Sequence, residues 1–220
     1  MAYFAALLCI VFAGLFLHVE SGEKYVSALI FKGLASLCFV AVGALCSPGT
    51  DTAKLILWGL IIGCIADVLL NLRFVFVKKG QPIFLFGILV FLTGHIMYLA
   101  AVLPLSSNPA VCIAAGIILT VLLMVWIFRH ITAKPVFKAF GVVYIGAITL
   151  LNCVAAGILI EAPSAFRCVF AAGAVLFLVS DILLILNTFG KGFRRSLRLA
   201  NISLYYAGQL LIAFSLMLLK

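Results

Sequence analysis

Two aspartates stand inside otherwise apolar segments of the chain. Asp67 lies in GCIADVLLNL and Asp181 lies in FLVSDILLIL. A charged aspartate at the centre of a membrane-spanning helix costs about 2.5–3.5 kcal/mol on insertion scales, so such residues usually have a function. The simpler alternative is that each carboxylate only joins helices through a neighbouring Ser, Asn or Lys.

Two carboxylates in a site of low dielectric constant need not carry the same charge. One can keep its proton and act as an acid, while the other is ionised and acts as a base. This combination suits a hydrolysis that passes through an oxocarbenium-like state, as in glycosidases. It equally suits a proton-coupled transporter, in which intramembrane acids relay protons. The residues by themselves leave both functions open.

Other polar residues are expected in the same region of the membrane. Asn71 follows Asp67 by one helical turn and therefore shares its face. The other candidates for substrate binding are Lys32, His95, Tyr98, Tyr205, Tyr206 and Gln209. Each also has an ordinary alternative: lysine can reach the headgroups, tyrosine can anchor at the interface, and histidine can join helices. The four remaining acids, Glu20, Glu23, Asp51 and Glu161, fall in connections and are expected to be solvated.

The composition requires lipid around most of the chain. Of 220 residues, 67% are hydrophobic and 10% are charged, whereas a soluble domain is about 45–50% apolar and about 25% charged. A helix needs about 20 mostly apolar residues to cross the hydrocarbon core. The pattern predicts helices at 2–17, 26–45, 54–72, 83–103, 110–128, 137–160, 165–187 and 199–219. The predicted fold is an all-α polytopic membrane protein, with one transmembrane domain over 1–220.

The basic residues indicate topology. The net charge is +9, but the charges lie between apolar segments, which points to anionic headgroups rather than nucleic acid. Twelve of the 15 Lys and Arg residues lie in or beside the odd-numbered connections. The positive-inside rule then predicts cytoplasmic odd-numbered connections and both termini outside. The protein is expected to be integral and multi-pass, in the cell membrane if the host is bacterial.

The two aspartates also hold equivalent places in an internal repeat. An offset of 114 residues separates positions 67 and 181. The same offset relates three further pairs: Gly59 and Gly173, Gly94 and Gly208, and His95 and Gln209. The repeats would cover about 1–104 and about 109–220, with four helices each, so both insert in the same direction. A pseudo-two-fold axis along the membrane normal is expected, with functional groups near the repeat interface.

Neither a metal nor an organic cofactor is expected. The seven cysteines form no CxxC pair, and six lie in apolar runs as small helical side chains. The chain has no GxSxG motif, no HExxH motif and no phosphate-cradling loop.

Four segments carry a more specific pattern: ADVLLNL (66–72), FGILVFLTGHIMYLAA (86–101), GAVLFLVSDILLIL (173–186) and LYYAGQLLIAFSL (204–216). Together with Phe31-Lys32-Gly33, they resemble the YhhN-type lysoplasmalogenase family. Two departures are the absence of Pro after Lys32 and the presence of Ala66 where a Gly commonly precedes the first Asp. Ala is also small, so it should be tolerated there.

The resemblance implies an eight-helix membrane enzyme that hydrolyses the vinyl ether bond of lysoplasmalogens. The products would be a fatty aldehyde and glycerophosphoethanolamine or glycerophosphocholine. One Asp would protonate the vinyl ether, and the other would stabilise the oxocarbenium and orient water. Lys32 and the tyrosines are expected to bind the phosphate headgroup. The expected partners are lysophospholipid and membrane lipid, without nucleic acid. The alternative is a small proton-coupled transporter or lipid-translocating protein using the same pair. The sequence does not distinguish acid from base or indicate an oligomeric state.

Overall fold

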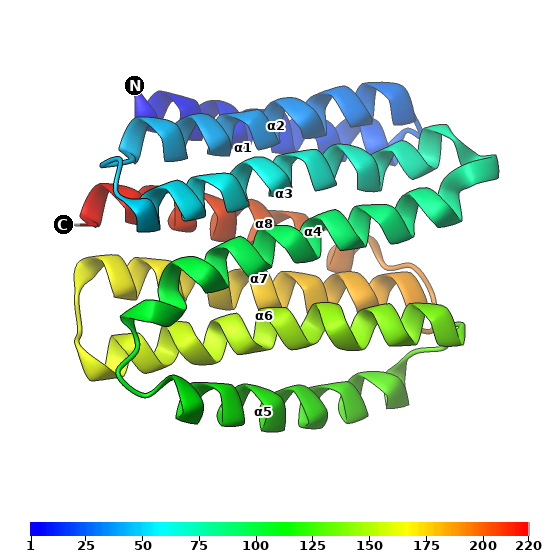
Figure 1. Ribbon diagram of the computed structural model, residues 1–220. Helices are drawn as coiled ribbons and strands as arrows, with labels where there is room; N and C mark the ends of the chain where they lie inside the picture. Colours follow the sequence, from blue (N-terminus) through cyan, green and yellow to red (C-terminus); the bar gives the residue numbers. More distant parts are fainter. Residues whose placement is uncertain (220) are drawn as a thin grey trace.

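The computed structural model describes residues 1–219, which fold into eight long helices without a β-strand (Figure 1). The helices are α1 (Ala2–Ser21), α2 (Tyr25–Cys46), α3 (Asp51–Val75), α4 (Gly80–Val102), α5 (Pro109–His130), α6 (Pro135–Glu161), α7 (Ala165–Phe189) and α8 (Arg195–Ser215). Short 3-10 turns follow α3, α4 and α8, at Val77–Lys79, Leu103–Leu105 and Leu216–Leu218. All eight helices are long and apolar enough to cross a membrane, so the predicted fold class is confirmed.

Most helices extend a few residues beyond the apolar segments that predicted them. Helix α3 begins at Asp51 because the hydroxyl of Thr50 caps it, accepting a hydrogen bond from the Ala53 amide at 3.3 Å. Helix α8 begins at Arg195, within the basic connection. Hydrophobicity marks only the part of a helix that lies in hydrocarbon, whereas backbone hydrogen bonding continues into the polar ends.

Six of the helices form a closed ring. Each of α2, α3, α4, α6, α7 and α8 contacts the next, and α8 returns to contact α2. Helix α1 packs outside this ring on α2 and α8, and α5 packs outside it on α6 and α7. The odd-numbered connections lie at one end of the bundle, and both chain termini lie at the other (Figure 1). Side chains from six helices can therefore converge on the middle of the bundle.

Two helix crossings are built from matching glycines. A Cβ on Gly94 would lie 3.2 Å from the carbonyl oxygen of Gly59, and a Cβ on Gly208 would lie 2.9 Å from that of Gly173. These are the residues that the 114-residue offset pairs, so α3–α4 and α7–α8 cross at equivalent positions. Four small residues are needed because the backbones touch. The agreement covers these two crossings, while the full repeat and its axis remain a prediction.

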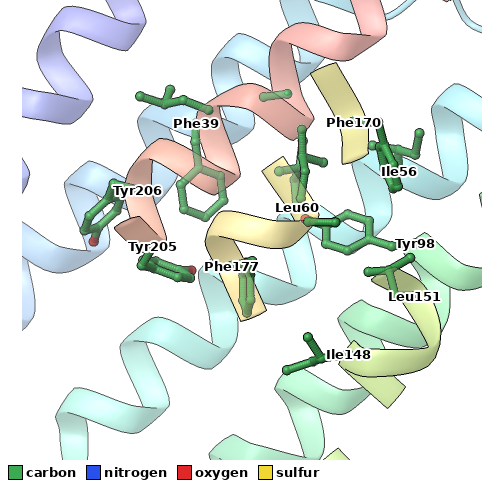
Figure 2. Packing of buried hydrophobic residues seen from close by; sticks show 14 of the residues in the cluster. Phe39, Ile56, Leu60, Tyr98, Ile148, Leu151, Phe170, Phe177, Tyr205 and Tyr206 are labelled. Carbon is green, nitrogen blue, oxygen red and sulfur yellow. The ribbon is translucent and has the colours of Figure 1, made fainter. Parts of the chain in front are cut away.

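The half of the bundle nearer the termini is filled by apolar side chains. Figure 2 shows Phe39, Leu60, Tyr98, Phe170 and Phe177, which come from α2, α3, α4 and α7, packed together. Each is at most 2% exposed. Large apolar residues that face outward surround the bundle, which suits contact with lipid.

Candidate active site

Asp67 of α3 is buried among donors from α2 and α8. Its Oδ1 lies 3.0 Å from the Lys32 ammonium. Its Oδ2 accepts hydrogen bonds from the hydroxyls of Ser36 and Tyr205, both at 2.6 Å. The Asp67 side chain is 2% exposed. One cation and two hydroxyl donors all stabilise a negative charge on this carboxylate.

A relay of hydrogen bonds positions the Tyr205 hydroxyl. Tyr98 of α4 donates to Gln209 Oε1 at 2.9 Å, and Gln209 Nε2 donates to the Tyr205 oxygen at 3.3 Å. Tyr205 then donates to Asp67. Tyr98 and Gln209 therefore act on the Asp67 carboxylate indirectly, by holding the Tyr205 hydroxyl in place.

Asp181 of α7 has fewer partners than Asp67. Its Oδ2 accepts one hydrogen bond, from the hydroxyl of Tyr144 in α6, at 2.5 Å. Within residues 1–219, no basic side chain lies at ion-pair distance from it. The preceding residue, Ser180, is held by Asn201, whose Nδ2 donates at 2.9 Å to both the Ser180 carbonyl and its hydroxyl. Asp181 is 4% exposed, so two equally buried carboxylates have unlike surroundings.

His95 packs among aromatic rings that include Tyr144, the hydrogen-bond partner of Asp181. Its Nδ1 donates to the Phe91 carbonyl at 2.9 Å, within α4. Its ring centroid lies 4.6 Å from that of Phe177 and 5.6 Å from that of Tyr144. Phe177 lies in turn 5.3 Å from the ring of Tyr205 (Figure 2). His95 is thus placed to orient Tyr144 by packing.

Tyr206 and Asn71 complete the predicted set. The Tyr206 hydroxyl donates to the Lys32 carbonyl at 3.3 Å and lies 3.4 Å from the Ser36 hydroxyl. Asn71 is 4% exposed, and its side-chain Nδ2 has no hydrogen-bond acceptor within the described chain. An amide nitrogen buried without a partner is expected to meet water or a ligand.

Both aspartates line one cavity in the middle of the ring. Its volume is about 40 Å³, and its other polar lining residues are Lys32, Asn71, Arg73, Tyr144, Arg198, Asn201 and Tyr205. This acid cavity can hold water. The structure therefore brings the two predicted acids together. His95, Tyr98, Tyr206 and Gln209 lie in the layer behind the lining.

An apolar cavity adjoins the acid cavity. It has a volume of about 60 Å³, and α4, α5, α6 and α7 supply most of its lining. The two cavities share five lining residues: Leu70, Phe84, Phe91, Tyr144 and Leu184. Its walls include Ile127, Phe128 and Gly141, and its surface is almost wholly apolar. The arrangement suits a hydrocarbon group placed next to the carboxylates.

A wide polar vestibule adjoins the acid cavity at the odd-numbered connections. Its volume is about 770 Å³, and it shares Arg73, Phe74, Leu184 and Arg198 with the acid cavity. Glu20 lines it too, and the expectation that Glu20 is simply solvated is wrong. Arg198 donates to both Glu20 oxygens, at 2.6 and 3.0 Å, and the pair is largely buried. The end of α1 meets the start of α8 here, a contact that the sequence does not predict.

The sequence model of the YhhN family matches residues 27–216. The chain belongs to the YhhN family. The matched region contains α3 to α8 and nearly all of α2, so the complete six-helix ring and every residue of the candidate site lie within this family region. No solved structure matches the chain.

Sequence reasoning missed five polar residues of this site: Ser36, Arg73, Tyr144, Arg198 and Asn201. Each is a polar residue inside a helix, but Ser and Tyr are common enough in membrane helices to carry little information alone. Tyr144 also lies in α6, outside the four segments on which the resemblance was recognised. Its link to Asp181 depends on how α6 packs on α7, which the spacing of residues along the chain does not specify.

Proposed function

We propose that this protein is a membrane hydrolase that cleaves the vinyl ether bond of lysoplasmalogen. The products are a fatty aldehyde and glycerophosphoethanolamine or glycerophosphocholine. One observation carries the proposal: Asp67 and Asp181 line the same cavity with different partners. Asp67 has a cation and two hydroxyl donors, whereas Asp181 has one hydroxyl donor. Membership of the YhhN family supports the same reading.

The unequal partners support one assignment of the acid and the base. Lys32 balances the charge of Asp67, so Asp67 serves as the carboxylate. Asp181 lacks such a cation and is buried, so it carries the proton at rest. Its Oδ2 is occupied by the Tyr144 hydroxyl, which leaves Oδ1 for the proton that is transferred. The sequence left this assignment open.

The proposed reaction returns both aspartates to their starting protonation states. Asp181 donates its proton to the β-carbon of the vinyl ether, and the double-bond electrons form the new C–H bond. The α-carbon becomes part of an oxocarbenium ion, which the Asp67 carboxylate stabilises. Water attacks this carbon and gives a proton to Asp67, forming a hemiacetal. Asp67 then protonates the glycerol oxygen as the C–O bond breaks, and Asp181 takes the hydroxyl proton, which restores both groups.

The neighbouring cavities support a position for the substrate. The apolar cavity takes the part of the hydrocarbon chain next to the vinyl ether, because its wall is continuous with the acid cavity through Tyr144 and Leu184. The vestibule admits water and holds the polar end of the lipid, because it is large and carries charged groups. Lys32 was expected to bind the headgroup, but its ammonium is engaged by Asp67, so we propose that it holds the base in place.

The direct test is aldehyde release from lysoplasmalogen by purified protein in detergent. Asp67→Asn and Asp181→Asn should each lower the turnover by a factor of about 10²–10⁴, as expected for loss of a general acid or base. Asp51→Asn is the matched control, because Asp51 is exposed and pairs only with Lys54. Thermal unfolding checks that each variant folds. Full activity in both site variants contradicts the proposal.

Measuring flux in liposomes together with aldehyde release distinguishes the hydrolase from the competing transporter. A proton-coupled transporter would show flux driven by a pH gradient in liposomes and no aldehyde. The packing supports hydrolysis instead, because fully buried residues such as Ile56, Phe170 and Ile158 fill the bundle on the side of the termini. If both Asn variants keep the wild-type rate of hydrolysis and the wild-type flux, the aspartates only join helices.

A further inference from the structure

Arg73 stands where the acid cavity meets the vestibule. It lines both, and its guanidinium lies 4.2 Å from the ring centroid of Phe84 and 4.6 Å from that of Phe74. Within residues 1–219, no carboxylate lies at ion-pair distance from Arg73. The two rings fix the plane of the guanidinium and leave its charge without a partner.

The neighbouring cation differs. Arg198 also lines both spaces, but Glu20 binds its guanidinium through two hydrogen bonds, and a third bond joins it to Asn201 at 3.3 Å. Lys32, the third cation of the acid cavity, is paired with Asp67. Arg73 is therefore the cation of the acid cavity that has no carboxylate at ion-pair distance in the described chain.

Two buried nitrogen atoms point to the same conclusion. The Nε of Arg73 and the Nδ2 of Asn71 have no acceptor within the described chain. Asn71 is 4% exposed and lines the acid cavity. Buried donors of this kind are normally satisfied, so a ligand with several acceptor oxygens fits this place.

We propose that Arg73, assisted by Asn71, binds the phosphate group of the lysolipid substrate. This inference rests on the proposed function. A planar guanidinium matches two phosphate oxygens at once, which a lysine cannot do. Arg73 follows Asp67 on α3 and lies about 9 Å nearer the vestibule, at 1.5 Å per residue. A glycerol backbone joins the vinyl ether oxygen to the phosphate, so a substrate with its ether at the aspartates directs its phosphate toward Arg73.

Binding can be measured without turnover. The ligands are a saturated 1-alkyl lysophospholipid, which has no vinyl ether to cleave, and the matching 1-alkylglycerol, which has no phosphate. Arg73→Gln should weaken binding of the phospholipid about 10- to 100-fold, as expected for loss of charged hydrogen bonds. It should change binding of the alkylglycerol by less than about twofold. Arg195→Gln is the matched control, because Arg195 lines the vestibule but not the acid cavity.

Three results would overturn the inference. Equal loss for both ligands would show that Arg73 only supports the fold. An equal loss in Arg195→Gln would show a general effect of positive charge. Arg73-dependent binding of inorganic phosphate, with no preference of the wild type for phospholipid over alkylglycerol, would indicate a site for free phosphate. If Arg73→Gln does not fold, Arg73→Lys replaces it in both binding measurements. The preference of the wild type for the phospholipid over the alkylglycerol still tests whether the site binds phosphate. Binding without aldehyde release contradicts the proposed function and leaves the phosphate site standing.

Discussion

The ammonium of Lys32 lies 3.0 Å from Oδ1 of Asp67, and both side chains are less than a tenth exposed. Breaking one partner of a buried ion pair leaves the other charge without compensation, which typically costs about 3–5 kcal/mol. Lys32→Met should therefore lower the free energy of unfolding by about that amount, measured by denaturant titration in mixed micelles. Adding Asp67→Asn should recover part of the loss. Lys54→Met removes the exposed Lys54–Asp51 pair and should cost less than about 1 kcal/mol.

Tyr144 is a positioning residue for the proposed acid. Its hydroxyl supplies the hydrogen bond to Asp181, so Tyr144→Phe should lower kcat about 10- to 100-fold and change KM little. The readout is the initial rate of aldehyde release against substrate concentration. Tyr206→Phe removes longer contacts, at 3.3 and 3.4 Å, and should change kcat less than about threefold. A rise in KM alone for Tyr144→Phe would place Tyr144 in substrate binding instead.

Gly141 offers a test of the apolar cavity. It lines that cavity, and a Cβ added there meets no atom within 4 Å. Gly141→Phe should fill the space and raise KM for a long-chain lysoplasmalogen about tenfold or more, corresponding to at least about 1.4 kcal/mol of lost binding. A vinyl ether analogue with a very short chain should be affected less. Gly141→Ala should behave like the wild type, and equal effects on both substrates would place the chain elsewhere.

Gly59 allows Tyr98 to lie against α3. A Cβ at Gly59 would overlap the Tyr98 ring, which must then move and lose its hydrogen bond to Gln209. Gly59→Ala should therefore destabilise the protein by about 1–3 kcal/mol, as overpacking does. Gly14→Ala is the control, because no atom lies within 4 Å of a Cβ there. It should be neutral or slightly stabilising, since Ala favours helix over Gly. Thermal unfolding in detergent compares the two.

Glu23 ends α1 in an unfavourable backbone conformation. Its φ of 58° is left-handed, and the amides of Glu23 and Lys24 donate to the carbonyls of Glu20 and Val19, as in a Schellman cap. Glycine is preferred at this position, yet Gly22 stands one residue earlier. Glu23→Gly should raise the free energy of unfolding by about 1 kcal/mol. A fall in stability would show that the Glu23 side chain makes a contribution larger than the backbone strain.

The sequence was sufficient to predict all eight helices and the two acids. Continuous apolar runs mark membrane helices directly, and an aspartate within such a run is conspicuous because of its insertion cost. The sequence named Tyr205, Tyr206 and Gln209 of α8 as candidates for substrate binding, but it did not predict the hydrogen bond from Gln209 to Tyr205. Each aspartate lies about two turns before the end of its helix, at Val75 or Phe189.

The partners of those residues could not be predicted in the same way. Which donor reaches which carboxylate depends on helix rotation and on neighbours far apart in the sequence, as for Tyr144 and Asp181. Lys32 could not be placed as a partner of Asp67 rather than a headgroup ligand, because both roles suit a lysine near a helix end. The Glu20–Arg198 pair joins the two ends of the chain, and no local pattern marks it.

The apolar cavity and the polar vestibule both adjoin the acid cavity, and this arrangement has a consequence for product release. In the proposed reaction, cleavage of one ether bond produces an apolar fatty aldehyde and a water-soluble phosphodiester. The aldehyde forms beside the wall of Ile127 and Phe128 in α5, the helix that packs outside the six-helix ring. The glycerophospho product forms beside Arg73, at the polar opening. The two products can leave by separate routes, the aldehyde through the apolar cavity and the phosphodiester through the vestibule, so neither has to pass the other and recombination is disfavoured.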